Sequence, residues 1–311
     1  MAGKKPTIRD IAAQAGVSPA SVSMILNQKN LSRFSDETIK LVQQTAADLQ
    51  YLPRHPNRAK RPEGTVMIIC PSVLNPYYST VIQSIEQEAV EQGFTTTIHT
   101  TYWNKETEKK LLDYSLTSPD IAGVIFAMIP QQPDLARAAS QQIPMVTIGD
   151  QLQDLGISTV NINSFTAGEI VGRYLIGLGH QNIAFISTTL NSEHSVRVRR
   201  RDGICHAYQS LCPSGHVTTQ SMEFTSKAEL NAIGIEHDVG YQLAQQCAKA
   251  HPEITAMVAT NDMVAYGVID GLRDLGLRIP DDISVCGFDN IFPSKFADIS
   301  LTTVDRNLRS L

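Results

Sequence analysis

The stretch that decides the organisation of this chain is residues 7–27, TIRDIAAQAGVSPASVSMILN. Thr7 has an aspartate three positions on, the spacing of a capping box, and Gly16 suits the left-handed conformation that ends a helix. Ser18 and Pro19 restart a helix, because serine is a strong N-cap and proline is tolerated in the first turn. The stretch therefore predicts two short helices joined by a tight turn.

An apolar stripe at helical spacing runs along the second of these helices and along a third helix beyond it. Val22, Ile25 and Leu26 form the stripe of the second helix. The third helix opens at Ser35 and carries four apolar residues inward: Ile39, Val42, Ala46 and Leu49. Three short helices with this turn are typical of a helix-turn-helix module, whose second helix lies in the major groove of DNA.

Charge separates this segment from the rest of the chain. Residues 1–63 hold ten basic and five acidic side chains, a net charge of about +5. The whole chain carries −5, which leaves about −10 for the remainder. A small structural three-helix cap needs no such asymmetry, whereas a basic nucleic-acid module joined to an acidic body produces it. The charge pattern therefore favours DNA binding.

The same stretch, followed by LQYLP at residues 49–53, resembles the amino-terminal signature of the lactose-repressor (LacI/GalR) family of transcription regulators. The resemblance implies that Pro19, Ala20 and Met24 read bases, although relatives often carry arginine at the last position. None of these side chains can form a bidentate hydrogen bond, but Ala20 and Met24 can contact thymine methyl groups. The resemblance also implies a phosphate-binding set: Thr7, Ser18, Ser21, Ser23, Asn27 and Tyr51.

Residues 51–64, YLPRHPNRAKRPEG, form a linker rich in proline and arginine. In the resembling family this segment is a hinge helix that folds on operator DNA and wedges a leucine into the minor groove. The sequence departs from the family here, because Lys60 stands at the leucine position and Pro56 costs about 3 kcal/mol inside a helix. We still expect DNA contacts from the polar side chains of the linker: Arg54, Asn57, Arg58 and Lys60.

From residue 65 the pattern changes to short buried strands that alternate with helices. Two series of similar length follow, the first from Thr65 and the second from near Ser164. This alternation predicts an α/β fold with two doubly wound parallel-sheet subdomains and a ligand cleft between them, behind the helix-turn-helix headpiece. The expected domains are a headpiece (1–50), a hinge (51–64) and a core (65–311), the core dividing into 65–162 plus 291–311 and 163–290.

Motifs of the same family recur through the body: NPYYS at 75–79, RRDG at 200–203, TNDMVAYG at 260–267 and IPDDISVCGFDN at 279–290. The resemblance implies a periplasmic-binding-protein-like core in which Arg200, Asn261 and Asp289 hydrogen-bond a small effector. Four further residues complete the expected effector site: Asn75, Tyr77, Tyr78 and Phe165. Asp262 remains open between ligand contact and a helix N-cap role.

Composition limits the other function classes. The five cysteines are scattered without a CxxC pair, which favours reduced thiols, and we expect no metal site and no cofactor. No apolar run reaches the roughly 18 residues that a membrane span needs, and no secretion signal opens the chain. A cytoplasmic protein without membrane contact is therefore expected.

These observations predict a DNA-binding transcriptional regulator of the LacI type, most simply a homodimeric repressor. Its partners would be operator DNA and a sugar-like effector, and no residue pattern predicts catalysis. Two alternatives stay open. The first is a sugar-binding protein of the periplasmic type, and the second is an activator or global regulator that uses a protein or phosphosugar co-effector.

Overall fold

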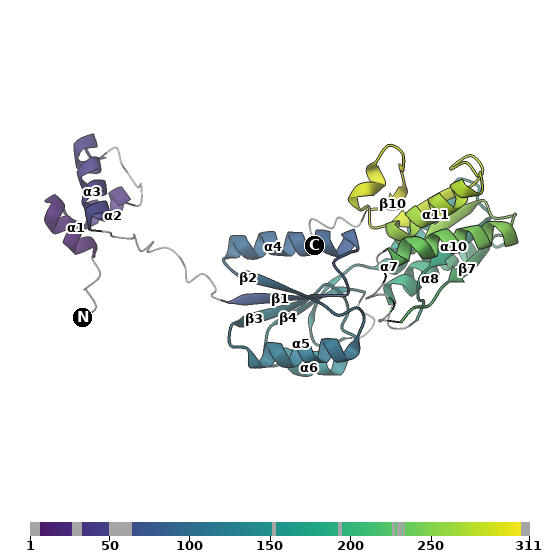
Figure 1. Cartoon of the computed structure of the whole chain (residues 1–311), viewed down its shortest axis with the longest axis horizontal. Helices are drawn as coiled ribbons and strands as arrows, with labels where there is room; N and C mark the ends of the chain where they lie inside the picture. The colour runs from purple at the N-terminus through teal and green to yellow at the C-terminus, as the bar shows by residue number, and fades with distance from the viewer. Residues whose placement is uncertain are drawn as a thin grey trace. The chain divides into compact units, whose positions relative to one another are not determined.

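A computed structural model describes residues 7–26, 33–49, 64–150, 154–191, 195–225, 228, 232 and 234–305 (Figure 1). The chain divides into two compact units, Met1–Arg61 and Pro62–Leu311. Six of the positions expected to contact DNA lie outside the described residues: Asn27, Tyr51, Arg54, Asn57, Arg58 and Lys60.

The first unit contains the helices α1 (Ile8–Ala15), α2 (Pro19–Leu26) and α3 (Asp36–Asp48). The predicted capping box is confirmed, because the backbone N–H and the hydroxyl of Thr7 both donate to the Asp10 carboxylate at 2.7 Å. Gly16 ends α1 with φ 67°, in the left-handed region. The Ser21 backbone N–H donates to the Ser18 hydroxyl at 3.1 Å, so Ser18 caps α2 as expected.

The three helices share one apolar core. Ile11, Val22, Ile25 and Val42 are all fully or almost fully buried, and Leu26 packs against this core from its edge. The predicted stripe of α2 therefore points inward, while Pro19 and Ala20 of the same helix are exposed.

The second unit is built from two five-stranded sheets in which every strand pair is parallel. The first has the order β2-β1-β3-β4-β5 and the second the order β10-β9-β8-β6-β7. The strands of the first sheet are β1 (Thr65–Cys70), β2 (Thr95–Thr100), β3 (Ile121–Phe126), β4 (Met145–Gly149) and β5 (Ser158–Asn161). Those of the second are β6 (Asn182–Ser187), β7 (His216–Ser221), β8 (Ala256–Ala259), β9 (Ser284–Phe288) and β10 (Thr302–Val304). The two-subdomain α/β prediction is confirmed.

Helices cover both faces of the first sheet, and together they form the first lobe. Helix α4 (Pro76–Gln92) lies on one face, and α5 (Lys105–Thr117) with α6 (Pro133–Ser140) lies on the other (Figure 1). Successive residues of β1 serve the two layers: Met67 packs in the cluster below α5 and α6, and Ile68 packs in the cluster below α4. This alternation is the two-residue period of a strand buried on both faces.

The second sheet and its helices form the second lobe. Helices α7 (Ser164–Gly177) and α8 (Ser195–Leu211) pack together on one face, and α10 (Ile235–Ala250) with α11 (Asp262–Asp274) packs on the other. Phe185 of β6 contributes to the first of these clusters and Ile186 to the second.

One part of the expected domain division needs correction. Residues 291–311 were expected to belong to the first subdomain, but β10 pairs with β9 of the second sheet. The expectation agrees with the position of Ile291, whose side chain packs in the α4 cluster of the first lobe. Ile291 therefore packs against the first lobe, whereas the strand that begins at Thr302 belongs to the second.

Glycine permits the close contact of α7 with α8. A Cβ added at Gly168 would lie 2.1 Å from the carbonyl oxygen of Arg200, and one added at Gly203 would lie 2.1 Å from that of Phe165. Neither obstacle is a flexible side chain end, so the helix backbones themselves would have to separate. The contact thereby fixes the start of α8 relative to α7.

We predict that Gly168→Ala lowers the thermal midpoint of the protein, since overpacking of this kind costs about 1–3 kcal/mol or more. Gly177→Ala is the matched control, because it lies in the same helix and an added Cβ there meets nothing within 4 Å. Calorimetry on both variants tests the contact. Equal midpoints would show that α7 and α8 are free to move apart.

Candidate functional site

A pocket of about 130 Å³ lies between the two lobes of the second unit. Its walls come from segments that follow strands: Ser72 after β1, Asn261 after β8 and Asp289 after β9. Because the carboxyl ends of parallel strands share one edge of a sheet, Asn261 and Asp289 meet at an edge of the second sheet, and Ser72 lies at the corresponding edge of the first. A cavity of about 150 Å³ is known to hold benzene, so the space suits one six-membered ring.

Two asparagines, one from each lobe, present amide donors to this pocket. Asn75 caps α4, its side-chain oxygen accepting from the Tyr77 N–H at 2.9 Å. Asn261 caps α11, and its side-chain oxygen accepts from the Val264 N–H at 2.9 Å. Because each side-chain oxygen accepts a hydrogen bond from a backbone N–H at a helix start, each NH₂ group points away from that helix and is available as a donor.

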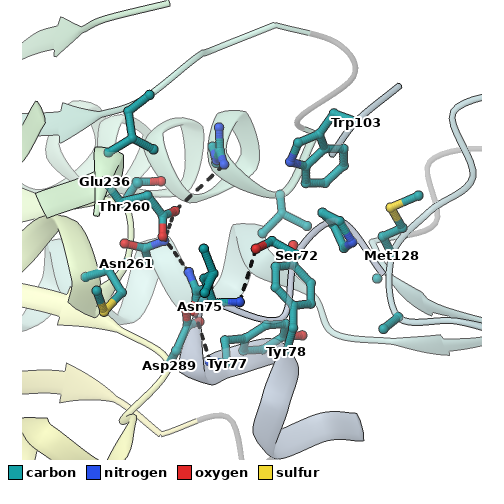
Figure 2. Close-up of a pocket in the computed structure, with 18 of the residues that line it drawn as sticks. Ser72, Asn75, Tyr77, Tyr78, Trp103, Met128, Glu236, Thr260, Asn261 and Asp289 are labelled. Carbon is teal, nitrogen blue, oxygen red and sulfur yellow. Dashed lines mark hydrogen bonds and ion pairs between the residues drawn. The ribbon is translucent and has the colours of Figure 1, made fainter. Parts of the chain in front are cut away.

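Both NH₂ groups donate to the carboxylate of Glu236, in the first turn of α10. The Asn75 Nδ2 to Glu236 Oε2 distance is 2.6 Å, and the Asn261 Nδ2 to Oε1 distance is 2.7 Å (Figure 2). Arg197 of α8 lies 3.9 Å from the same carboxylate. Glu236 therefore joins the two lobes. Sequence reasoning missed Glu236, because it lies in none of the family motifs. The sequence indicated only that it stands next to the start of a predicted helix.

Arg200 and Asp289 form a buried ion pair on the wall of the pocket. Arg200 NH2 donates to Asp289 Oδ1 at 2.7 Å, and its NH1 donates to the carbonyl of Thr260. The Arg200 guanidinium also lies over the Phe288 ring, 4.7 Å from its centroid. Both charged residues are at least 96% buried, so each depends on the other, and losing one costs about 3–5 kcal/mol.

Asp262 neither lines the pocket nor caps α11. It is fully buried, and its carboxylate accepts hydrogen bonds from Thr303 Oγ1 at 2.6 Å, Ser294 Oγ at 2.7 Å and the Ile291 N–H at 3.0 Å. Burial raises the pKa of Asp262 to about 7, and the nearby charge of Asp289 adds to the rise. Its observed role is to tie the segment 291–303 to α11.

Aromatic and apolar side chains form the remaining walls. The rings of Tyr77 and Tyr78 meet edge to face at 5.0 Å, and both line the pocket as expected. Figure 2 shows Trp103 and Met128 across the pocket from the Glu236 side. Trp103 is the one tryptophan of the sequence, and sequence reasoning did not select it.

Phe165 was expected to form an apolar wall, and that expectation is wrong. Among the described residues that line the pocket, Phe165 is absent. Its ring instead lies 5.5 Å from the Arg199 guanidinium and 5.6 Å from the His206 ring. The reason is its position in the first turn of α7, on the side that faces α8. Arg199 in turn pairs with Asp150 of the first lobe at 3.3 Å, a second bridge between the lobes.

In the first unit, the outer face of α2 holds the base-reading candidates. Pro19 and Ala20 are exposed and Met24 is partly exposed. The hydroxyls of Ser18 and Ser21 lie 2.9 Å apart, and that of Thr7 is bound to Asp10. Ser23 is partly buried on the same helix. The geometry leaves the DNA-contact assignments of these residues as predictions.

The described residues contain no group of three or more His, Cys, Asp or Glu side chains that could hold a metal ion. All five cysteines are unpaired thiols. Within the same ranges no helix has the length and apolarity that crossing a bilayer requires.

Two family models match this chain. A model described as "Bacterial regulatory proteins, lacI family" matches residues 7–54, and one described as "Periplasmic binding proteins and sugar binding domain of LacI family" matches residues 63–311. The HTH-type transcriptional regulator DegA of Bacillus subtilis (strain 168) is 30% identical over 316 residues, covering 99% of this chain and 88% of DegA.

Two solved structures show the same fold. A LacI family transcriptional regulator from Lactobacillus casei with bound sucrose is 26% identical, with a TM-score of 0.67 over 79% of this chain and 88% of its own. The lac repressor dimer bound to operator and the anti-inducer ONPF is 24% identical, with a TM-score of 0.67 over 99% of this chain and 89% of its own.

We predict that Asp262 makes the protein less stable as pH rises. Between about pH 4 and about pH 7 the unfolded chain releases the Asp262 proton while the folded chain retains it, because the folded pKa is about 7. Raising the pH through this window therefore favours unfolding, and above it the contribution is constant. Asp262→Asn should remove this part of the slope in urea unfolding measured from pH 5 to 8. The exposed Asp120→Asn is the control, and a slope unchanged by Asp262→Asn would contradict the prediction.

Proposed function

Because this chain belongs to the LacI family of bacterial regulatory proteins, we propose that it is a transcriptional repressor controlled by a small metabolite in the interlobe pocket. It is a DNA-binding regulator, and the two family matches together span residues 7–54 and 63–311. The observation that carries the metabolite proposal is the pocket itself, where amide donors, carboxylates and guanidinium groups meet apolar rings.

The proposed DNA contact is the outer face of α2. Ala20 and Met24 offer apolar contact to thymine methyl groups, and Pro19 shapes the entry of the helix. The net charge of about +5 on residues 1–63 supplies attraction to phosphates. The linker side chains Arg54, Arg58 and Lys60 are proposed to add contacts beside the groove.

A homodimer is the proposed assembly. Two copies would place two α2 helices about one DNA turn apart, on a near-palindromic operator. The lac repressor, which has the same fold, is a dimer on operator DNA, and this supports the assignment. A cytoplasmic location follows from the proposed role, since the operator is there.

A neutral polyhydroxylated ring compound is the proposed ligand class. Hydroxyl groups can donate to Glu236 and Asp289 and accept from Asn75 and Asn261, while Trp103 covers an apolar ring face. The related regulator from Lactobacillus casei holds sucrose, which supports this class. The effector itself is not identified by these contacts.

Ligand binding is proposed to act through the disposition of the two lobes. The polar contacts between them include Asn75 with Glu236 and Asp150 with Arg199. A ligand that competes for Glu236 changes the relative free energy of the lobe arrangements, and it can shift DNA affinity only by its differential affinity for them. The domain assignment behind this scheme is a headpiece of residues 1–50, a hinge of 51–64 and a core of 65–311.

The α2 contact can be tested with one added charge. Ala20→Asp should weaken binding to genomic promoter fragments at low salt by about 100-fold, because it places an anion on the helix face that is proposed to enter the groove of the negatively charged DNA. An aspartate in the first turn suits the helix dipole, so the fold should persist. Gln43→Asp, the same charge change at an exposed site of α3, is the control in the gel-shift assay. Equal weakening by both variants would mean that α2 is not the reading helix.

The pocket can be tested by removing its buried ion pair as a unit. Arg200→Met combined with Asp289→Leu leaves no unpaired buried charge, and it should eliminate the response to metabolites while DNA affinity stays within about threefold of wild type. Trp103, the one tryptophan of the chain, reports pocket occupancy by fluorescence during a sugar and nucleoside screen.

Arg278→Met combined with Asp282→Leu makes the same change in an exposed ion pair and should leave the response intact. A metabolite response that survives loss of the Arg200–Asp289 pair would place the effector site elsewhere.

A further inference from the structure

The pocket is a meeting point of helix starts. The first turns of α4, α8, α10 and α11 all line it, through Tyr77, Arg197, Glu236 and Met263 among others. The N-terminus of a helix carries a partial positive charge of roughly half an elementary charge, and this effect is felt within the first turn. The backbone therefore makes this pocket favourable for an anion.

Four formally charged side chains are found among the described residues of the pocket wall. Arg200 is matched by Asp289 at 2.7 Å. Arg197 and Glu236 remain, 3.9 Å apart, and among the described lining residues Glu236 is the carboxylate that belongs to the first turn of a lining helix. The protein has thus placed its own carboxylate where the surrounding field favours a ligand anion.

We propose that Glu236 is the residue that sets the charge selectivity of the pocket, by occupying the anion position and excluding phosphorylated or carboxylated ligands. This inference rests on the proposed function, since it concerns the same pocket. Glu236 holds the anion position through two amide donors and Arg197. A ligand anion entering beside it would meet a like charge at close range, and this repulsion is poorly screened at the effective dielectric of such sites.

A neutral hydroxyl meets the opposite situation. A carboxylate accepts about four hydrogen bonds, and Asn75 with Asn261 accounts for two of them. The remaining lone pairs of Glu236 can accept from ligand hydroxyls without any unpaired charge. The same carboxylate thus rejects an acidic ligand and binds a polyol.

Inorganic phosphate is the probe that tests this assignment without knowledge of the effector. Full-length wild-type protein and Glu236→Gln are titrated with phosphate against sodium chloride of equal ionic strength, reading Trp103 fluorescence and the thermal midpoint. We expect no saturable binding to wild type and binding at least about tenfold tighter to Glu236→Gln, because the like charge is gone while the helix starts remain.

Two further variants make the result specific. Glu91→Gln, at an exposed position of α4, changes the net charge equally and should leave phosphate binding as in wild type. Adding Arg197→Gln to Glu236→Gln should remove the gained binding, since the side-chain cation at the anion position is lost. The midpoint of each variant without phosphate verifies that it is folded.

Saturable phosphate binding to wild type, or none to folded Glu236→Gln, would overturn the assignment. A gain shared by Glu91→Gln would overturn it as well, because net charge alone would then explain the effect. These outcomes are separable from failure of the regulatory proposal. That proposal fails if no metabolite alters DNA binding, whereas the phosphate titration reports on the pocket whether or not DNA responds.

Discussion

The position of the pocket residues depends on the parallel direction of every strand pair in both sheets. In a parallel sheet each strand ends at the same edge, and the helix that follows begins there. Residues that are far apart in sequence, such as Asn261 and Asp289, are therefore brought to a common edge of the second sheet, and Asn75 reaches the same pocket from the corresponding edge of the first sheet. The pocket is polar because helix-capping residues, and carboxylates that directly follow strands, lie at such edges. Its charged groups then compensate one another in pairs.

Helix packing fixes what the strands bring together. Gly168 and Gly203 let α7 and α8 approach until backbone meets backbone, and this contact involves the carbonyl of Arg200 itself. From this position the Arg200 guanidinium reaches Asp289 and the carbonyl of Thr260, just after β8. Asp262 holds the returning segment at 291–303 against α11, which keeps Asp289 in place from the other side. The buried ion pair is thus supported by packing on both sides.

Sequence reasoning predicted the elements with clear local signals. The capping box of Thr7, the turn at Gly16 and the strand–helix alternation depend on neighbours in sequence, and all three are observed. Phe165 was misassigned because its direction depends on how α7 packs on α8, which no local pattern encodes. The pairing of β10 with β9 was missed for a similar reason: three residues carry too little periodicity to reveal their sheet. Glu236 was overlooked because its hydrogen bond with Asn75 joins segments 161 residues apart, and Trp103 because its relevance lies in lining a pocket that forms only on folding.

The two capping asparagines have a consequence for how such a pocket can change. Each uses one end of its amide to begin a helix and the other end to face the ligand space. A substitution there alters recognition and folding at once, so few replacements are tolerable. The tyrosine, tryptophan and methionine side chains of the walls do not combine these two roles. New ligand preferences in a lineage should therefore arise by exchange of those apolar side chains, while the two asparagines are retained.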